Sequence, residues 1–319
     1  MTYRGPMSSG VRIRSAAAVL VAASLVVAGC SSLSDQVDLG VPGVSGRWVE
    51  VVGAGSGFEA GLVRRALVAS PVDVEPRQQS FLGSGAETPA GGLPLVVANH
   101  SLGGSPEILA YLSGWPSVVA TDRILVAFPE GWESSFDAGT CCGPAAAEGV
   151  DDVAFIDDVI DAVSALYPVD PDRIFMTGFS NGGMMTYRYL CDHADRLAGA
   201  ASVTGTNADG CAPSAPVSFL QITGRTDEVV PPGGGPSVTP GIGPFESPLE
   251  STAEVAAVSG CTQEATRSFG GVEATRWTDC ADDVRVVHEL VPFGHEWPAT
   301  EAYAATARQL EFWGLRPVP

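Results

Sequence analysis

Residues 173–185 read RIFMTGFSNGGMM and combine the pattern of a strand with that of a helix. The apolar run from Ile174 is typical of a buried strand, and a helical pattern follows from Gly183. Between them, residues 178–182 form the motif Gly-x-Ser-x-Gly around Ser180. In a strand-to-helix context, this motif predicts a nucleophile elbow, a sharp turn that exposes a serine at the carboxyl edge of a sheet. The flanking glycines leave room for a turn that side chains would block.

Short apolar runs rich in β-branched residues alternate with helical patterns along the rest of the chain. The expected strands are 48–52, 62–68, 95–98, 124–128, 174–177, 200–203, 217–222 and 284–290. The expected helices are 153–166, 183–190, 249–258 and 302–313. This alternation predicts an α/β fold in which a mostly parallel central sheet carries helices on both faces.

A serine nucleophile needs a base, and an imidazole base needs a carboxylate that orients it. After an elbow of this kind, the acid and then the base are expected at the ends of later strands. The expected strand 217–222 leads to Asp227, which we predict to be the acid, with the adjacent Glu228 as second choice. His295 lies between the last expected strand and the last expected helix, so we predict that it is the base.

The chain has four histidines, so three others compete for the role of base. His193 falls near the end of the helix after the elbow, where a surface or capping role is expected. His288 lies inside an expected strand, where it is expected to pack. His100 precedes the serine, which is the wrong order for a base, but the turn after it is where an oxyanion donor is expected. We therefore assign the oxyanion hole to the backbone N–H groups of Leu102 and Asn181.

The amino terminus is typical of an export signal. Arginines precede the apolar run 16–29, which is too short to span a bilayer comfortably. Small residues lead directly to Cys30 and resemble the lipobox of bacterial lipoproteins, in which the cysteine becomes lipidated; an ordinary signal peptide is the alternative. We predict a signal peptide over 1–29, a lipid anchor and tether over 30–46, and a catalytic domain over 47–319. The protein is expected to be exported, either lipid-anchored to the cell membrane or extracellular.

Six further cysteines in an exported chain predict three disulfides. Cys261 and Cys280 flank an expected hairpin, so we pair them. A bond between the adjacent Cys141 and Cys142 conflicts with the Cα separation of ordinary disulfides. We therefore expect each of these two to pair elsewhere, in an order that stays open, with Cys191 and Cys211. A zinc site is the alternative, although the sequence has no paired Cys-x-x-Cys spacing.

Composition excludes several kinds of chemistry. All 17 basic residues are arginines, so a P-loop lysine, a lysine Schiff base and a Ser–Lys dyad are impossible. The formal net charge of −20 argues against a nucleic-acid partner, because phosphate binding needs a basic face. The predicted chemistry requires no metal or organic cofactor. The expected partners are a small ester substrate and, through the lipid anchor alone, a membrane; the oligomeric state stays open.

These residues resemble the esterase and polyhydroxybutyrate-depolymerase family of α/β-hydrolases, which includes LpqC-type lipoproteins and related feruloyl esterases. The matching segments occur in order at 94–104, 128–132, 141–143, 150–155, 178–183, 224–231 and 294–298. The resemblance implies an α/β-hydrolase fold with Ser180 as nucleophile, Asp227 as acid and His295 as base. One departure is Ser101 after His100, where the family usually has glycine.

The resemblance implies a secreted serine esterase that hydrolyses carboxylic esters through an acyl-enzyme, either polyhydroxybutyrate depolymerase-like or feruloyl esterase-like. Trp132 and Trp297 lie near the matching segments and are expected to line a substrate pocket, and the loop 231–248 is expected to border the cleft. Small, soluble, neutral esters are expected, because the acidic chain disfavours anionic polymers. Two alternatives are a serine peptidase of the same fold and a catalytically inactive binding lipoprotein of the cell envelope.

Overall fold

The computed structural model describes residues 32–53, 61–77 and 91–316. The predicted signal peptide over 1–29 and the predicted lipidation site Cys30 lie outside the described residues. Among the helices that the structure does describe, none combines the length and the hydrophobicity that crossing a bilayer requires.

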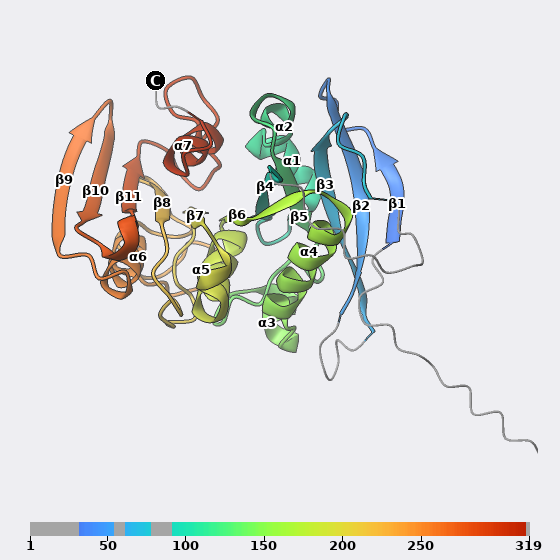
Figure 1. The fold of residues 1–319 in the computed structure, drawn as a ribbon. Helices are drawn as coiled ribbons and strands as arrows, with labels where there is room; N and C mark the ends of the chain where they lie inside the picture. Colours follow the sequence, from blue (N-terminus) through green and yellow to red (C-terminus); the bar gives the residue numbers. More distant parts are fainter. Residues whose placement is uncertain (1–31, 54–60, 78–90, 317–319) are drawn as a thin grey trace, which may run out of the picture.

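The strands of the described chain form a single sheet in the order β1-β2-β3-β5-β4-β6-β7-β8-β11-β10-β9 (Figure 1). Their bounds are β1 Ser32–Val37, β2 Val44–Val52, β3 Val63–Pro71, β4 Leu93–Asn99, β5 Leu125–Pro129, β6 Val169–Phe179, β7 Gly199–Val203, β8 Phe219–Gly224, β9 Gln263–Phe269, β10 Val272–Thr278 and β11 Val286–Val291. The strands from β5 to β11 in that order are parallel. Antiparallel strands extend the sheet on both sides. The predicted sheet, mostly parallel at its centre, is therefore confirmed.

Helices cover both faces of this sheet (Figure 1). Their bounds are α1 Pro106–Ser113, α2 Pro116–Asp122, α3 Gly143–Glu148, α4 Asp152–Leu166, α5 Asn181–His193, α6 Pro248–Val258 and α7 Ala305–Phe312. One hydrophobic cluster packs α4, α5 and α6 against the sheet, and a second packs α1, α2 and α7. Because both faces are buried, central strands such as β4 are apolar at successive positions: Leu95 and Val97 join the first cluster, Val96 and Ala98 the second.

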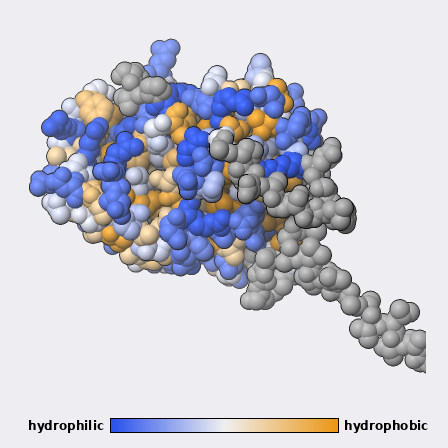
Figure 2. Space-filling view, in the orientation of Figure 1, coloured by the Kyte–Doolittle hydropathy of each residue, from blue (hydrophilic) through white to orange (hydrophobic). Residues whose placement is uncertain are grey.

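The two ends of the sheet differ from its buried centre. At one end every residue of β9 is exposed, and β9 pairs only with β10. At the other end β1 pairs with β2, so the described residues 32–37 and 44–46, which were expected to belong to a tether, join the sheet instead. The sequence of β1 shows no alternation of apolar and polar residues. This edge strand is held by backbone hydrogen bonds to β2, which do not depend on the side chains. Figure 2 shows hydrophilic residues predominating on the visible face, with apolar residues between them.

The described residues contain three disulfides, of which one has the predicted partners. Cys261 and Cys280 are bonded across the base of the β9–β10 hairpin, as predicted. The predicted separate pairing of Cys141 and Cys142 is wrong, because these adjacent residues are bonded to each other. The prediction applied the Cα separation of ordinary disulfides, whereas the Cα atoms of this bonded pair lie only 3.0 Å apart. The remaining bond joins Cys191 to Cys211.

His288 on β11 is buried and contacts one polar side chain, with its Nε2 3.0 Å from Thr223 Oγ1. Burial lowers the pKa of His288 from its ordinary value to about 4. Between about pH 6.5 and pH 4, His288 is therefore protonated in the unfolded chain but neutral in the folded chain. The free energy of unfolding is expected to fall as the pH drops from about 6.5 to about 4, by on the order of 3 kcal/mol from this residue.

His288→Gln should remove this component of the pH dependence. Urea unfolding of both proteins at pH 7.5 and pH 4.5 measures it, because the carboxylates contribute equally to wild type and variant. The variant should lose less stability on acidification than the wild type. An equal loss in the two proteins would show that His288 does not resist protonation in the folded state.

Candidate active site

Ser180 lies in a strained turn between β6 and α5. Its backbone angles are φ 55° and ψ −117°, outside the regions that residues with side chains favour. A Cβ on Gly178 would lie 2.0 Å from the Gly182 carbonyl oxygen, and one on Gly182 would lie 2.1 Å from the Asn99 carbonyl oxygen. Both positions therefore require glycine, and the helix begins at once, with the Met184 N–H donating to the Ser180 carbonyl at 2.9 Å. The turn has the predicted elbow geometry.

Two hydrogen bonds of equal length join Ser180, His295 and Asp227. His295 Nε2 is 2.8 Å from Ser180 Oγ, and His295 Nδ1 is 2.8 Å from Asp227 Oδ2. The other carboxylate oxygen of Asp227 accepts from the N–H groups of Val229 and Val230 at 2.8 and 2.9 Å. The buried carboxylate is thus fixed by its own loop and presents one oxygen to the imidazole. Glu228, the second choice for the acid, is exposed.

The loops that carry these three side chains follow β6, β8 and β11, which lie close together in the parallel part of the sheet. The imidazole also packs against an aromatic ring, with the Phe179 and His295 centroids 5.4 Å apart. Ser180 is 9% exposed, so its hydroxyl lies in a largely enclosed site. A serine held against a histidine that a buried carboxylate orients can act as an activated nucleophile.

The turn after β4 carries one of the amides expected to form an oxyanion hole. Within the described chain, neither the Leu102 N–H nor the Asn181 N–H donates a hydrogen bond. The surrounding turn is fixed, because Gly103 N–H donates to the Ser134 carbonyl at 2.7 Å and Gly104 N–H donates to the Ser101 carbonyl at 2.9 Å. Both expected amides are therefore free to bind an anionic oxygen.

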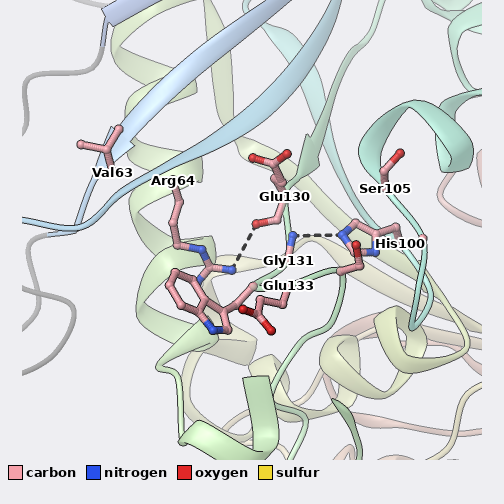
Figure 3. Close-up of a pocket in the computed structure, with 10 residues that line it drawn as sticks. Val63, Arg64, His100, Ser105, Glu130, Gly131 and Glu133 are labelled. Atoms are coloured by element: carbon pink, nitrogen blue, oxygen red, sulfur yellow. Dashed lines mark hydrogen bonds between the residues drawn. The ribbon is translucent and has the colours of Figure 1, made fainter. Parts of the chain in front are cut away.

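His100 joins this turn to the loop after β5 (Figure 3). Its Nε2 accepts from the Gly131 N–H at 2.9 Å, and its Nδ1 lies 2.8 Å from the Ser101 carbonyl oxygen. Because the Gly131 amide can only donate, the ring proton belongs on Nδ1, which donates to Ser101. Burial lowers the pKa of His100, which favours this neutral form. The sequence pattern excluded His100 as a base but did not reveal this bracing role, although its place beside the oxyanion turn was a signal.

A cavity of about 290 Å³ opens beside Ser180. Apolar side chains dominate its lining, which consists of Ser101, Leu102, Cys141, Cys142, Phe179, Ser180, Met184, Val229, Val230, Thr239, Ile242, Phe245 and His295. Three of these residues, Thr239, Ile242 and Phe245, belong to the loop 231–248. The prediction that this loop borders the cleft is therefore confirmed.

The two tryptophans expected in the substrate pocket do not line this cavity, so that prediction is wrong for it. Trp297 is buried, donates from Nε1 to Thr306 Oγ1 at 3.2 Å and packs edge-on against Phe179. It supports the ring that contacts His295, which explains its place near the site. Trp132 lines a separate cavity of about 280 Å³, together with His100 and Glu130.

One group in the described chain has ligand atoms close enough together for a metal ion, namely Cys191, Asp209 and Cys211. Its two sulfurs are bonded to each other. A metal needs the thiolate form of cysteine, so this group does not support the zinc alternative.

Comparison with individual known proteins gives the family, although no family model matches the chain. The protein named "Putative esterase NocK" of Nocardia uniformis subsp. tsuyamanensis is 33% identical over 245 residues, covering 69% of this chain and 71% of that protein. Feruloyl esterase B of Piromyces equi is 30% identical over 205 residues, covering 60% of this chain and only 37% of that longer protein. The acetyl xylan esterase from Aspergillus awamori shares the fold, with a TM-score of 0.54 and 16% identity over 89% of this chain and all of that one.

The chain therefore belongs to the esterase family of α/β-hydrolases and is, by class, a carboxylic ester hydrolase.

His100→Phe should lower kcat about 10- to 100-fold and change KM by less than about threefold, because the oxyanion turn loses its brace while the cavity keeps its walls. His100→Gln, whose amide can accept from Gly131, should recover part of the loss. Steady-state kinetics on p-nitrophenyl acetate, with the melting temperature of each variant, measures this effect. A His100→Phe enzyme that is folded and has wild-type kcat would exclude the bracing role.

Proposed function

We propose that this protein is an exported serine esterase with Ser180 as nucleophile, His295 as general base and Asp227 as the residue that orients the imidazole. The observation that carries the proposal is the continuous chain of two 2.8 Å hydrogen bonds from Ser180 Oγ through His295 to Asp227. It lies at a strained elbow, which is the position that exposes a serine for attack.

In the proposed reaction, His295 Nε2 takes the proton of Ser180 while Oγ attacks the ester carbonyl carbon. The carbonyl oxygen becomes an oxyanion that accepts from the N–H groups of Leu102 and Asn181, each contributing about 100- to 1000-fold in rate. His295 then protonates the departing alcohol and leaves an acyl-enzyme. It next deprotonates a water molecule, which attacks the acyl carbon. The bond from that carbon to Ser180 Oγ then breaks, His295 returns the proton to Oγ, and the acid is released from the restored enzyme.

The cavity beside Ser180 supports a neutral acyl group. His295 is the one lining residue with a side chain that can carry charge, so a carboxylate on the acyl group would find no arginine there. The relatives are named for feruloyl and acetylxylan esters. We therefore infer short acyl or hydroxycinnamoyl esters as substrates, with the polyester of a polyhydroxybutyrate depolymerase as the alternative.

The proposed location is outside the cytoplasm. Three disulfides are typical of exported proteins. The sequence of the amino terminus supports an export signal and a lipid on Cys30, which would hold the enzyme at the cell membrane.

Ser180→Ala and His295→Ala should each lower kcat on p-nitrophenyl acetate by at least about a thousandfold, because each removes a member of one catalytic unit. His193→Ala is the matched control, since this partly buried histidine packs on Tyr189 at the far end of α5 and should leave kcat unchanged. Labelling by a fluorophosphonate probe should follow the same pattern. Unlabelled wild-type protein would favour the inactive binding lipoprotein, and an active His295→Ala enzyme would disprove the assigned base.

The substrate proposal predicts rapid release of ferulate from methyl ferulate and little clearing of crystalline polyhydroxybutyrate. The reason is that a concave cavity of about 290 Å³ suits one small acyl group better than the surface of a polymer. Both assays use the same purified protein, with Ser180→Ala as the blank. Fast clearing of the polymer without ferulate release would reverse the assignment.

A further inference from the structure

The bond between Cys141 and Cys142 forms part of the wall of the cavity that contains Ser180 and His295. The two residues are 1% and 8% exposed and belong to the hydrophobic core. A disulfide has no hydrogen-bond donor, and its sulfurs are polarisable, so this part of the wall is apolar.

The side chain of Asn181, the residue after the nucleophile, holds this wall in place. Its Oδ1 accepts from the Phe136 N–H at 2.8 Å. Its Nδ2 donates to the Phe136 carbonyl at 3.0 Å and to the Cys141 carbonyl at 3.4 Å. Asn181 is fully buried, and the Ala138 N–H also donates to the Cys141 carbonyl at 2.9 Å. The backbone N–H of Asn181 is assigned to the oxyanion hole. Asn181 therefore links the disulfide wall, through its side chain, to the proposed oxyanion site, through its backbone.

The other side of the wall lies against the second oxyanion residue. Gly143 follows the disulfide with φ +82°, and a Cβ there would lie 2.6 Å from Leu102 Cδ1. The chain at Gly143 is therefore packed directly against Leu102. The disulfide thus lies beside both residues whose amides are assigned to the oxyanion hole, and it lines the same cavity as Ser180.

We propose that the Cys141–Cys142 disulfide is the surface against which the acyl group of the substrate packs, so that it determines acyl specificity. This inference rests on the proposed esterase function. The acyl groups that fit are neutral and extended or planar, such as an alkyl chain or an aromatic acrylate. Acetyl is too short to use the wall. Opening the disulfide removes the fixed surface but leaves Ser180, His295 and Asp227 in place.

The test compares the double variant Cys141→Ala/Cys142→Ala with the control Cys261→Ala/Cys280→Ala, whose bond closes the β9–β10 hairpin and does not line the cavity. For each protein, kcat/KM is measured on p-nitrophenyl acetate and p-nitrophenyl cinnamate. The ratio of cinnamate to acetate should fall about tenfold in the first variant, because contacts in an apolar pocket discriminate by about that factor. The ratio should stay within about twofold of wild type in the control.

A second series of esters shows whether the acyl part or the alcohol part of the substrate packs against the disulfide. Acetates of methanol and benzyl alcohol share the acyl group and differ in the alcohol, so their relative rates should not change in either variant. A shift in the alcohol series instead of the acyl series would overturn the inference, as would equal losses on cinnamate and acetate.

Reduction of the wild-type protein tests the same inference if the double variant does not fold. A phosphine reductant opens disulfides. Alkylation and peptide mass on one portion identify the pair that opened, and reoxidation of the portion left unalkylated restores the bond. The cinnamate preference should fall when Cys141–Cys142 opens and return when it closes. An unchanged ratio with this pair open overturns the inference alone, whereas a wild type that hydrolyses none of these esters overturns the proposed function and the inference with it.

Discussion

The conformation of Ser180 is the constraint on which the site depends. A positive φ of 55° for a residue with a side chain is unfavourable and persists only where the surroundings enforce it. Here the chain on either side approaches so closely that Gly178 and Gly182 have no room for a Cβ. The Ser180 N–H also donates to the Val203 carbonyl on β7 at 2.9 Å. Sheet and helix together thus hold the hydroxyl at the carboxyl edge of the strands.

From that fixed point, the topology supplies the partners. In parallel strands the carboxyl ends meet at one edge, so the loops after β8 and β11 reach the same region as the elbow after β6. These loops alone bring Asp227 and His295 to Ser180. The loop that carries Asp227 also contributes Val229 and Val230 to the lining of the cavity. One edge of the sheet therefore carries both the proposed reacting groups and much of the cavity beside them.

The sequence predicted those parts of the structure that local pattern or strand order determines. The elbow is encoded by five consecutive residues, and the proposed acid and base, which lie after expected strands, are brought together with Ser180. The disulfide at Cys141–Cys142 was missed because the prediction required the Cα separation of ordinary disulfides, which this bonded pair does not have. Strand β1 was missed because it is a mostly polar edge strand that pairs with β2 alone, so its sequence shows no alternation of apolar residues. Trp297 was assigned to the pocket because sequence proximity to His295 does not tell which way an indole points.

The open end of the sheet at β9 has a consequence for the behaviour of the molecule in concentrated solution. An exposed strand offers unpaired backbone groups on which a second chain could extend the sheet, which is a route to aggregation. Here the strand carries the charged residues Glu264 and Arg267, and the Cys261–Cys280 bond closes the hairpin at its base. With a net charge of −20, two such molecules also repel each other. The charged side chains, the closed hairpin and the net charge therefore all oppose extension of the sheet at this edge.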